Sequence, residues 1–299
     1  MTWIHRGVLA VLPHVPRPVM RRLSARYIAG ETLEEELAKL SELARRGHPG
    51  ILDLLGEGVE DEADARAALA AYTRAAEAVS AQKLDTYISV KPTHLGLMRS
   101  EALALELYST LARRLRELGL FLRVEMEDHP TTDATLRVFE ALRSAHQNVG
   151  IVLQSRLFRT GADIARLAPG PLDVRMVKGI YLEPAQIAHV EPEPIRAAYY
   201  EHCTALFARG ARVCFATHDA GLAERLIGLV RERAIPPTRY EFQVLLGVQE
   251  ALWERWRGGG HQVRVYVPFG PEWLPYSLRR LKKNPQILGH VMRAAVGLA

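Results

Sequence analysis

The sequence predicts an α/β fold, a (β/α)8 barrel with helices before its first strand and after its last. Short apolar, β-branched runs recur eight times, and helical patterns separate them. This alternation is typical of βαβ units with parallel strands. No G-x-G-x-x-G fingerprint follows a strand, which disfavours an open dinucleotide-binding sheet. A barrel needs about 250 residues, so one barrel plus an extension accounts for the 299 residues of the chain.

We expect one domain, 1–299, with a helical extension at 1–50 and the catalytic barrel at 51–299. Within the extension, Thr32 precedes Glu35 by three residues, the capping-box spacing that begins a helix. The Gly-His-Pro-Gly segment at 47–50 ends that helix, because glycine and proline interrupt helical periodicity. The first strand therefore begins near residue 51.

From residue 51 onward, expected strands and helices alternate. The expected strands are 51–55, 86–90, 120–126, 149–153, 174–177, 212–216, 240–244 and 263–267. The expected helices are 62–82, 101–118, 133–145, 162–167, 194–208 and 222–233, with Trp253 in a further helix. After the last strand, a Pro-Phe-Gly turn leads to a proline-initiated helix that ends in Arg279-Arg280 and lies over the barrel mouth.

Composition excludes several classes of protein. The net charge of +5 comes largely from arginines spread along helices, whereas nucleic-acid binding favours a concentrated basic patch, so we expect no nucleic-acid partner. Cys203 and Cys214 fall in an expected helix and an expected strand, which argues against a disulfide framework and for a reducing compartment. No apolar run reaches the roughly 18 residues of a membrane span. The expected location is the cytoplasm.

Polar side chains recur where the expected strands end, while the strand middles are mostly aliphatic. In a (β/α)8 barrel the working residues project from these carboxyl ends. Strand-to-loop transitions are polar in many proteins, so the pattern favours a catalytic rim without establishing it. The polar residues at the strand ends are Asp53, Lys91, Glu125, Glu127, Asp128, Gln154, Arg175, Lys178, Thr217, His218 and Tyr266.

Two of these positions carry specific expectations. Lys91 suits a Schiff base or an anion anchor, and a lysine snorkelling to the surface is an equal alternative. Arg175 lies inside an apolar strand, where burial without a counter-ion is costly. Glu125 is the partner that we expect for it.

Two further groups of polar residues bear on whether the chain binds an anion or a metal. Arg279-Arg280, beside Tyr266 and Tyr276, suits an anion with an apolar body. His218 has no second histidine or cysteine at metal-ligand spacing, so we expect no metal.

Seven stretches together resemble the proline dehydrogenase family, and they occur in that family's order. The likeness covers nearly the whole chain from about residue 25. The length matches the monofunctional bacterial type, which is similar to the proline dehydrogenase domain of bifunctional proline utilisation flavoenzymes. The stretches are Val90-Lys91, RVEMED at 123–128, NVGIVLQS at 148–155, RMVKGIY at 175–181, FATHD at 215–219, YEFQVLLG at 240–247, and the segment from Tyr266 to Arg279-Arg280.

The resemblance implies a distorted (β/α)8 TIM barrel that holds FAD noncovalently. It implies oxidation of L-proline to Δ1-pyrroline-5-carboxylate by hydride transfer from C5 to flavin N5, the first step of proline catabolism to glutamate. It also implies that a membrane quinone receives the electrons. Peripheral contact with the inner face of the cell membrane is left open.

The resemblance further implies roles for individual residues. Glu125 stands where many family members have Asp, so its carboxylate is kept one methylene further out, with Glu127 and Asp128 as alternatives. The implied catalytic residues are Glu125, Arg175 and Tyr266. The implied substrate-binding residues are Lys91, Leu245, Tyr276, Arg279 and Arg280. The implied FAD-binding residues are Met126, Gln154, Arg175, Val177, Lys178, Gly179, Tyr181, Thr217 and His218.

Other functions remain open at the level of sequence. One alternative is a different FAD-binding barrel enzyme, similar to methylenetetrahydrofolate reductase, which shares the fold and the cofactor. A barrel aldolase would use Lys91 or Lys178 as a Schiff-base lysine. A basic RNA- or membrane-binding protein would show salt-dependent binding without turnover.

Overall fold

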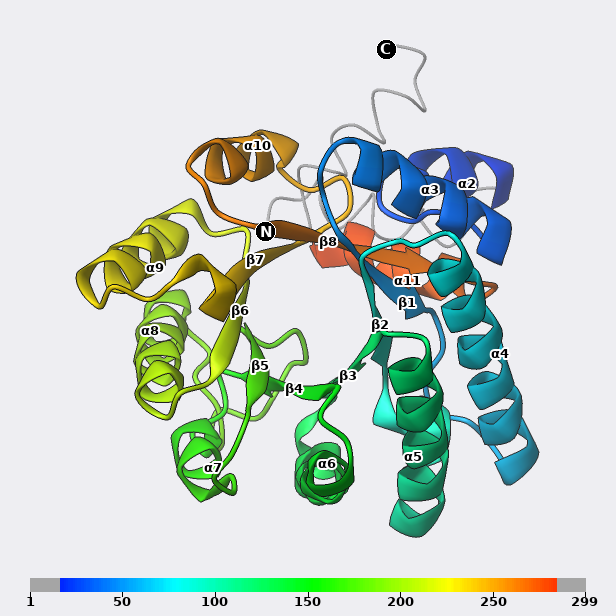
Figure 1. Ribbon diagram of the computed structural model, residues 1–299, viewed down its shortest axis with the longest axis horizontal. Coiled ribbons are helices and arrows are strands. Elements are labelled where there is room, and N and C mark those ends of the chain that lie inside the picture. The colour runs from blue at the N-terminus through cyan, green and yellow to red at the C-terminus, as the bar shows by residue number, and fades with distance from the viewer. Residues whose placement is uncertain (1–16, 284–299) are drawn as a thin grey trace.

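The computed structural model describes residues 17–283 and contains a closed barrel of eight parallel strands. The strands follow one another around the barrel in chain order, and the last pairs with the first (Figure 1). Every expected strand is present, and two have the expected bounds, β2 (Thr86–Val90) and β6 (Arg212–Ala216). The other strands are β1 (Gly50–Leu54), β3 (Phe121–Val124), β4 (Val149–Gln154), β5 (Asp173–Val177), β7 (Tyr240–Leu245) and β8 (Val263–Phe269).

Each strand is followed by a helix, and all of these helices except the last cover the outside of the barrel (Figure 1). These helices are α4 (Glu62–Ala81), α5 (Glu101–Glu117), α6 (Thr132–Ala145), α7 (Thr160–Arg166), α8 (Pro192–Ala208), α9 (Ala220–Glu232), α10 (Glu250–Gly258) and α11 (Trp273–Lys283). Short 3-10 turns precede α5, α6 and β7: η2 (Pro92–Leu95), η3 (His129–Thr131) and η4 (Pro237–Arg239). None of the described helices is long and apolar enough to cross a membrane.

Two helices precede the barrel, α2 (Arg17–Ser24) and α3 (Leu33–Arg45). The expected capping box of α3 is confirmed, because Thr32 accepts a hydrogen bond from Glu35 N and the Glu35 carboxylate accepts one from Thr32 N. A cap of this kind contributes about 1 kcal/mol to the stability of its helix.

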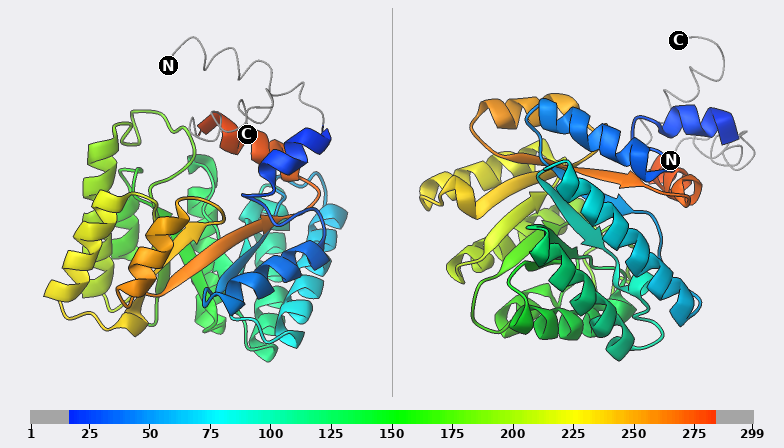
Figure 2. Two further views of the ribbon diagram at one scale, coloured as in Figure 1. Left: turned by 90° about the horizontal axis from the view of Figure 1, so that it is seen from above. Right: turned by 45° about the vertical axis from the view of Figure 1, so that its right-hand side comes forward.

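The segment between α2 and α3 is bonded to the carboxyl end of β8. Ala29 N donates to Pro268 O at 2.9 Å, and Gly270 N donates to Gly30 O at 3.0 Å. Through these bonds α2 lies beside α11 at one end of the barrel (Figure 2). The N-terminal helices are therefore part of the rim of the barrel.

A second contact on this rim needs a glycine. Gly247 has φ +71°, and a Cβ there would lie 2.0 Å from Arg26 O. Arg26 Nε also donates to Gly247 O at 3.1 Å. A side chain at position 247 would force the two segments apart.

Polar side chains fill the inside of the barrel in two layers. Successive residues of a strand face opposite sides, so positions two apart both point inward. Two strands each supply one residue to each layer, Asp173 and Arg175 from β5 and Glu241 and Gln243 from β7. A third pair is Arg123 of β3 and Glu125, which follows the last residue of that strand. The first member of each pair lies deep in the barrel, and the second lies at its mouth.

The deep layer, here called the charged floor, comprises Arg123, Asp173, Arg212, Glu241 and Arg264. Asp173 lies between Arg123 and Arg212, with Arg212 Nη1 3.0 Å from Asp173 Oδ2. Glu241 lies between Arg212 at 2.7 Å and Arg264 at 3.0 Å. Burial disfavours the ionised carboxyl groups, but the neighbouring guanidinium groups outweigh it and lower the pKa of Asp173 and of Glu241.

The sequence does not lead us to expect this floor. The prediction that strand middles are mostly aliphatic holds for the outward-facing residues, which pack under the helices, and is wrong for the inward-facing ones. The two cysteines agree with expectation, since Cys203 on α8 and Cys214 on β6 are both buried and free. Cys214 Sγ contacts the floor, 3.3 Å from Arg212 Nη1.

The largest departure in strand bounds is β3, which ends at Val124 instead of residue 126. Glu125 N still donates to Val90 O at 2.9 Å, but the chain then turns across the mouth. The turn is fixed by the Glu127 carboxylate, which accepts from Thr93 N at 2.9 Å and from Thr93 Oγ1 at 2.8 Å.

Candidate active site

The carboxyl ends of the strands surround a cavity of about 610 Å³. Cavities of about 300–1,000 Å³ are typical of small-molecule and cofactor sites. Every residue expected to bind substrate or cofactor or to act in catalysis, and whose side chain is described, lines this cavity. The structure thus brings together positions spread over nearly 190 residues of chain, from Lys91 to Tyr276. They are Lys91, Glu125, Met126, Gln154, Arg175, Val177, Lys178, Gly179, Tyr181, Thr217, His218, Leu245, Tyr266 and Tyr276.

Arg279 and Arg280 stand apart from this set. Both belong to α11, which follows β8 as expected. Their side chains lie outside the part of the chain that the structure describes. The anion site expected of them therefore stays a prediction.

Arg175 and Glu125 form an ion pair at the centre of the mouth, which confirms the expected partnership. Arg175 Nε also donates to Gln243 Oε1 at 2.5 Å, and its guanidinium carbon lies 5.2 Å from the centre of the Tyr266 ring. Glu125 accepts a hydrogen bond from Ser89 as well. Burial alone would raise the pKa of Glu125, but Arg175 and then Ser89 outweigh it and lower that pKa. The guanidinium is thus fixed between a carboxylate and an amide.

Lys91 enters the cavity from β2 and pairs with Asp53 of β1, with Nζ 3.3 Å from Oδ1. Its side chain is only 15% exposed, so the alternative of a lysine that snorkels to the surface is wrong. Burial disfavours the ammonium, yet Asp53 and then Glu125 outweigh it and raise the pKa of Lys91. A lysine held as a cation suits an anion anchor better than a Schiff-base nucleophile, which needs a lowered pKa.

Lys178 lies on the other side of the mouth and is held by Asp219 at 2.6 Å. Asp219 also accepts from Arg196 Nε at 2.6 Å and caps α9 through Leu222 N. Burial would raise the pKa of Asp219, but its bonds to Lys178 and Arg196 lower it well below the ordinary value. Two cations and the N-terminus of α9 therefore meet at one side of the cavity.

Two residues that line the cavity each have a buried polar atom without a hydrogen-bond partner among the described residues, Arg175 Nη2 and Gln154 Oε1. Leaving a buried donor or acceptor unpaired costs about 1–3 kcal/mol. Beside them Gly179 has φ +97°, and a Cβ there would lie 2.8 Å from Gln154 Oε1. A polar heterocycle in the cavity would supply the missing partners.

The other expected polar residues have local roles. His218 Nε2 accepts a hydrogen bond from Leu245 N at 3.0 Å, so this nitrogen is already engaged. Glu127 lines the cavity but is committed to Thr93, and Asp128 does not line it, so neither is a substitute for Glu125. Among residues 17–283, no group of three histidine, cysteine or acidic side chains could hold a metal.

Sequence reasoning missed several lining residues, and Gln243 is the most consequential. Its Nε2 donates to Glu241 Oε1 at 2.6 Å while its Oε1 accepts from Arg175. The available signal was its spacing, two residues after Glu241 in one strand. The other lining residues that were missed are Glu57, Val152, Ile180, Ala216, Val244, Val248 and Gln249.

The sequence matches the profile of a known family over residues 37–293, and the description of that family is Proline dehydrogenase. Proline dehydrogenase of Deinococcus radiodurans is 33% identical, over 93% of this chain and 91% of that protein. Proline dehydrogenase 1 of Bacillus subtilis is 29% identical, over 91% of this chain and 90% of that protein.

The fold is similar to that of a much larger protein. Proline utilization A from Bdellovibrio bacteriovorus, in a crystal structure of the form inactivated by N-propargylglycine, superposes with a TM-score of 0.83 at 22% identity. The match covers 92% of this chain but 36% of that one. At this identity the likeness concerns the fold alone.

Proposed function

The chain belongs to the proline dehydrogenase family and is an oxidoreductase that acts on CH–NH donors; on this basis we propose that it oxidises L-proline to Δ1-pyrroline-5-carboxylate, with FAD held noncovalently in the barrel-mouth cavity. The observation that carries the proposal is Arg175, a cation that Glu125 fixes in that cavity and that has one nitrogen without a partner in the described part of the chain.

The residues around the cavity fit a flavin. The unpaired atoms of Arg175 and Gln154 match the ring nitrogens and carbonyl oxygens of an isoalloxazine. Lys178 and Arg196 together outweigh the charge of Asp219 and leave net positive charge for a phosphate group. The backbone at Gly179 leaves room where a side chain would fill the cavity. The residues that would hold FAD are Met126, Gln154, Arg175, Val177, Lys178, Gly179, Tyr181, Thr217 and His218.

Bound FAD supplies a hydride acceptor for the C5 hydrogen of proline. The contribution of Arg175 is electrostatic, because a fixed cation stabilises negative charge that grows beside it in a site shielded from water. Glu125 and Gln243 hold the guanidinium in place, so this stabilisation requires little reorganisation when the charge develops.

Proline itself would lie between Lys91 and the apolar part of the mouth. Lys91 binds the carboxylate, and we propose that Arg279 and Arg280 complete this clamp, since guanidinium forks bind carboxylates in a bidentate manner. Tyr266, Tyr276 and Leu245 would enclose the ring methylenes. Burial, with Asp53 and Glu125 nearby, raises the pKa of Tyr266 well above its ordinary value, so its hydroxyl is a poor base for the proline amine.

A membrane quinone is the proposed electron acceptor. A protein without a described membrane-spanning helix would meet this acceptor by peripheral contact at the inner face of the cell membrane.

An absorption spectrum tests the proposal directly. The purified protein should show flavin bands, and L-proline added without oxygen should bleach them. A colourless protein would overturn the flavin assignment. Flavin that proline fails to bleach would favour a different FAD-dependent barrel reductase, and trapping of a lysine by borohydride with a carbonyl substrate would favour the aldolase.

Arg280→Met tests the carboxylate clamp. Losing a hydrogen bond to a charged group costs about 1.5–3 kcal/mol, so KM for proline should rise roughly 10- to 100-fold while the protein stays yellow. Steady-state kinetics beside the flavin content of the purified variant measures both. Loss of flavin with an unchanged KM would contradict the clamp.

A further inference from the structure

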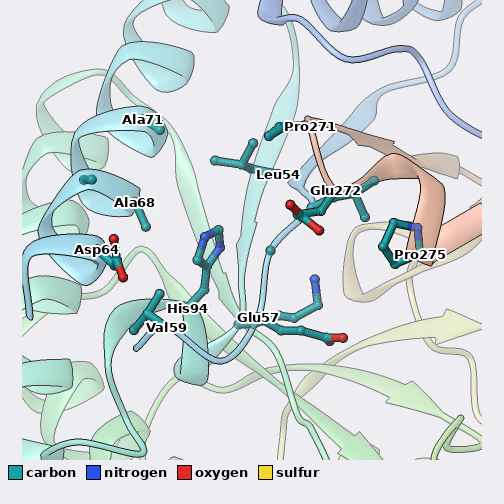
Figure 3. Close-up of a pocket in the computed structure, with 14 residues that line it drawn as sticks. Leu54, Glu57, Val59, Asp64, Ala68, Ala71, His94, Pro271, Glu272 and Pro275 are labelled. Carbon is teal, nitrogen blue, oxygen red and sulfur yellow. The ribbon is translucent and has the colours of Figure 1, made fainter. Parts of the chain in front are cut away.

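A second cavity, of about 470 Å³, lies beside the mouth. Its walls come from the loop after β1, the first turns of α4, the turn η2 and the segment before and within α11 (Figure 3). It shares Glu57 and Lys91 with the mouth cavity, so these two side chains stand between the two spaces. We call it the side pocket.

One wall of the side pocket is flat and apolar. Ala67, Ala68 and Ala71 lie together on α4, because residues three and four apart share a helix face. Methyl side chains leave this face without projections, and Leu54 and Val59 add further apolar surface. Such a wall suits a planar ring.

His94 is the neutral polar side chain of the side pocket, whose charged lining residues are Glu57, Asp64, Lys91 and Glu272. Its Nδ1 lies 3.1 Å from the Tyr72 hydroxyl, and Nε2 has no hydrogen-bond partner among the described residues. The Tyr72 hydroxyl also lies 3.3 Å from Leu54 O, and it can donate to only one of these two acceptors. The contact with His94 Nδ1 is the shorter of the two, and when Tyr72 donates there, the ring proton resides on Nε2, which then donates. Burial and the nearby Lys91 lower the pKa of His94 to about 4, so the imidazole is neutral at pH 7.

The place of this imidazole is fixed by its neighbour. A Cβ at Gly56 would lie 2.4 Å from His94 Nε2, so the absence of a side chain there makes room for the ring.

Carboxylates surround the entrance of the side pocket. Figure 3 shows Asp64 and Glu272 on opposite sides of His94, and Glu57 lies toward the mouth. All three residues are exposed. Their charge repels carboxylates and phosphates, so the pocket disfavours a second amino acid or a nucleotide. An uncharged ring with a carbonyl oxygen satisfies both the apolar wall and the His94 donor.

We propose that the side pocket binds the ring of the quinone acceptor, with a carbonyl oxygen on His94 Nε2 and the ring against the alanine face of α4. This inference rests on the proposed function. Proline loses two electrons and two protons on becoming Δ1-pyrroline-5-carboxylate, and a quinone takes up the same number when its two carbonyl groups become hydroxyl groups. Both protons come from water at the exposed entrance, while His94 Nε2 donates a hydrogen bond to the carbonyl oxygen and keeps its own proton.

The test fills the pocket from the alanine face. Ala71→Phe places a ring in the side pocket, while Ala70→Phe puts the same side chain on the exposed side of the same helix and serves as the control. Both holoenzymes are illuminated with a benzoquinone that carries an aryl azide, and the labelled peptides are identified. The same proteins are assayed with menadione, an uncharged quinone, and with ferricyanide, a trianion.

The expected label falls on residues 54–72, 91–94 or 271–275 of the Ala70→Phe protein and is lost in Ala71→Phe. For Ala71→Phe, kcat/KM for menadione should fall at least about tenfold, with the bleaching rate and ferricyanide turnover within about twofold of the control. Label elsewhere, or equal menadione kinetics in the two variants, would overturn the quinone site.

Failure of the reaction would look different from failure of the pocket. If proline bleaches the flavin of neither variant, the proposed function fails, and the labelling result still reports on the pocket. If Ala71→Phe does not fold, Ala67→Phe fills the same pocket from its exposed rim and takes its place.

Discussion

The charged floor and the mouth of this barrel take residues from the same strands but differ in how their polar groups are paired. Both draw on β3, β5 and β7, and in each case the mouth residue follows the floor residue by two positions, within β5 and β7 and just past the end of β3. On the floor, each carboxylate lies between two guanidinium groups. At the mouth, Arg175 and Gln154 line the cavity, and Arg175 Nη2 and Gln154 Oε1 have no hydrogen-bond partner within residues 17–283.

The difference shows where a barrel can leave polar groups unsatisfied. A buried charge without a partner is strongly destabilising, so a closed layer must pair its charges internally. A layer that opens on a cavity can keep donors and acceptors for a ligand. One atom breaks the contrast, since Arg123 Nε on the floor also lacks a partner among the described residues.

Removing a floor charge should have the largest effect. Glu241→Gln leaves Arg212 and Arg264 without their shared carboxylate, and breaking a buried pair costs about 3–5 kcal/mol. Urea denaturation measures the free energy of unfolding. Glu77→Gln is the control, because its exposed pair with Arg114 should contribute about 1 kcal/mol or less. Equal losses for the two variants would show that the floor is not specially stabilising.

A change at the mouth should slow the chemistry more than it weakens the fold. Arg175→Lys keeps a positive charge near Glu125 but loses the fork that also reaches Gln243, so flavin reduction by proline should slow about 100-fold. Rapid-mixing absorbance under anaerobic conditions measures this rate. The matched floor variant, Arg123→Lys, should lose stability and keep a flavin-reduction rate within a few-fold of the parent. If instead Arg123→Lys slowed flavin reduction and Arg175→Lys lowered only stability, the floor and the mouth would not have the roles given to them here.

Gln243 joins the two layers, so Gln243→Leu should affect both measurements. It leaves Arg175 Nε and one Glu241 contact unpaired, at about 1–3 kcal/mol of stability, and should slow flavin reduction several-fold. A double-mutant cycle with Glu241→Gln measures the coupling between the layers. A rate change with full stability, or the reverse, would mean that Gln243 belongs to one layer only.

The smallest expected effect is a pH dependence at the edge of the mouth. The pKa of His94 is about 4 in the folded protein against an ordinary 6.5. Between these values the unfolded chain binds a proton that the folded one does not, so stability falls as pH drops from about 6.5 toward 4. Between pH 7 and pH 5 the parent should lose about 2 kcal/mol more stability than the His94→Asn variant does. If the urea midpoints of the parent and of His94→Asn differ by the same amount at pH 7 and at pH 5, the fold does not keep the His94 imidazole neutral.

The sequence predicts the barrel well because the signals for it are local. Alternating strand and helix periods, and caps such as Thr32 with Glu35, depend on neighbouring residues. The bounds of β2 and β6 are therefore predicted without error, and the end of β3 is not, because a distant residue, Thr93, turns the chain there.

The candidate site was predicted by another route. The resemblance to a family selected positions that the fold then gathers around one cavity, and polarity at strand ends agreed with it. The charged floor escaped because each charge on it is balanced by a residue from another strand. Arg123 and Asp173, for example, are 50 positions apart. The side pocket escaped because an alanine face has no chemical signature in a sequence.

The bond between Ala29 N and Pro268 O, with the pairing of β1 and β8, has a consequence for biosynthesis. A ribosome makes residue 29 early and residue 268 late, so the first helices have to wait for nearly the whole chain before their partner exists. The rim over the cavity is consequently among the last parts to assemble, and a flavin would enter a nascent barrel that is still open on that side.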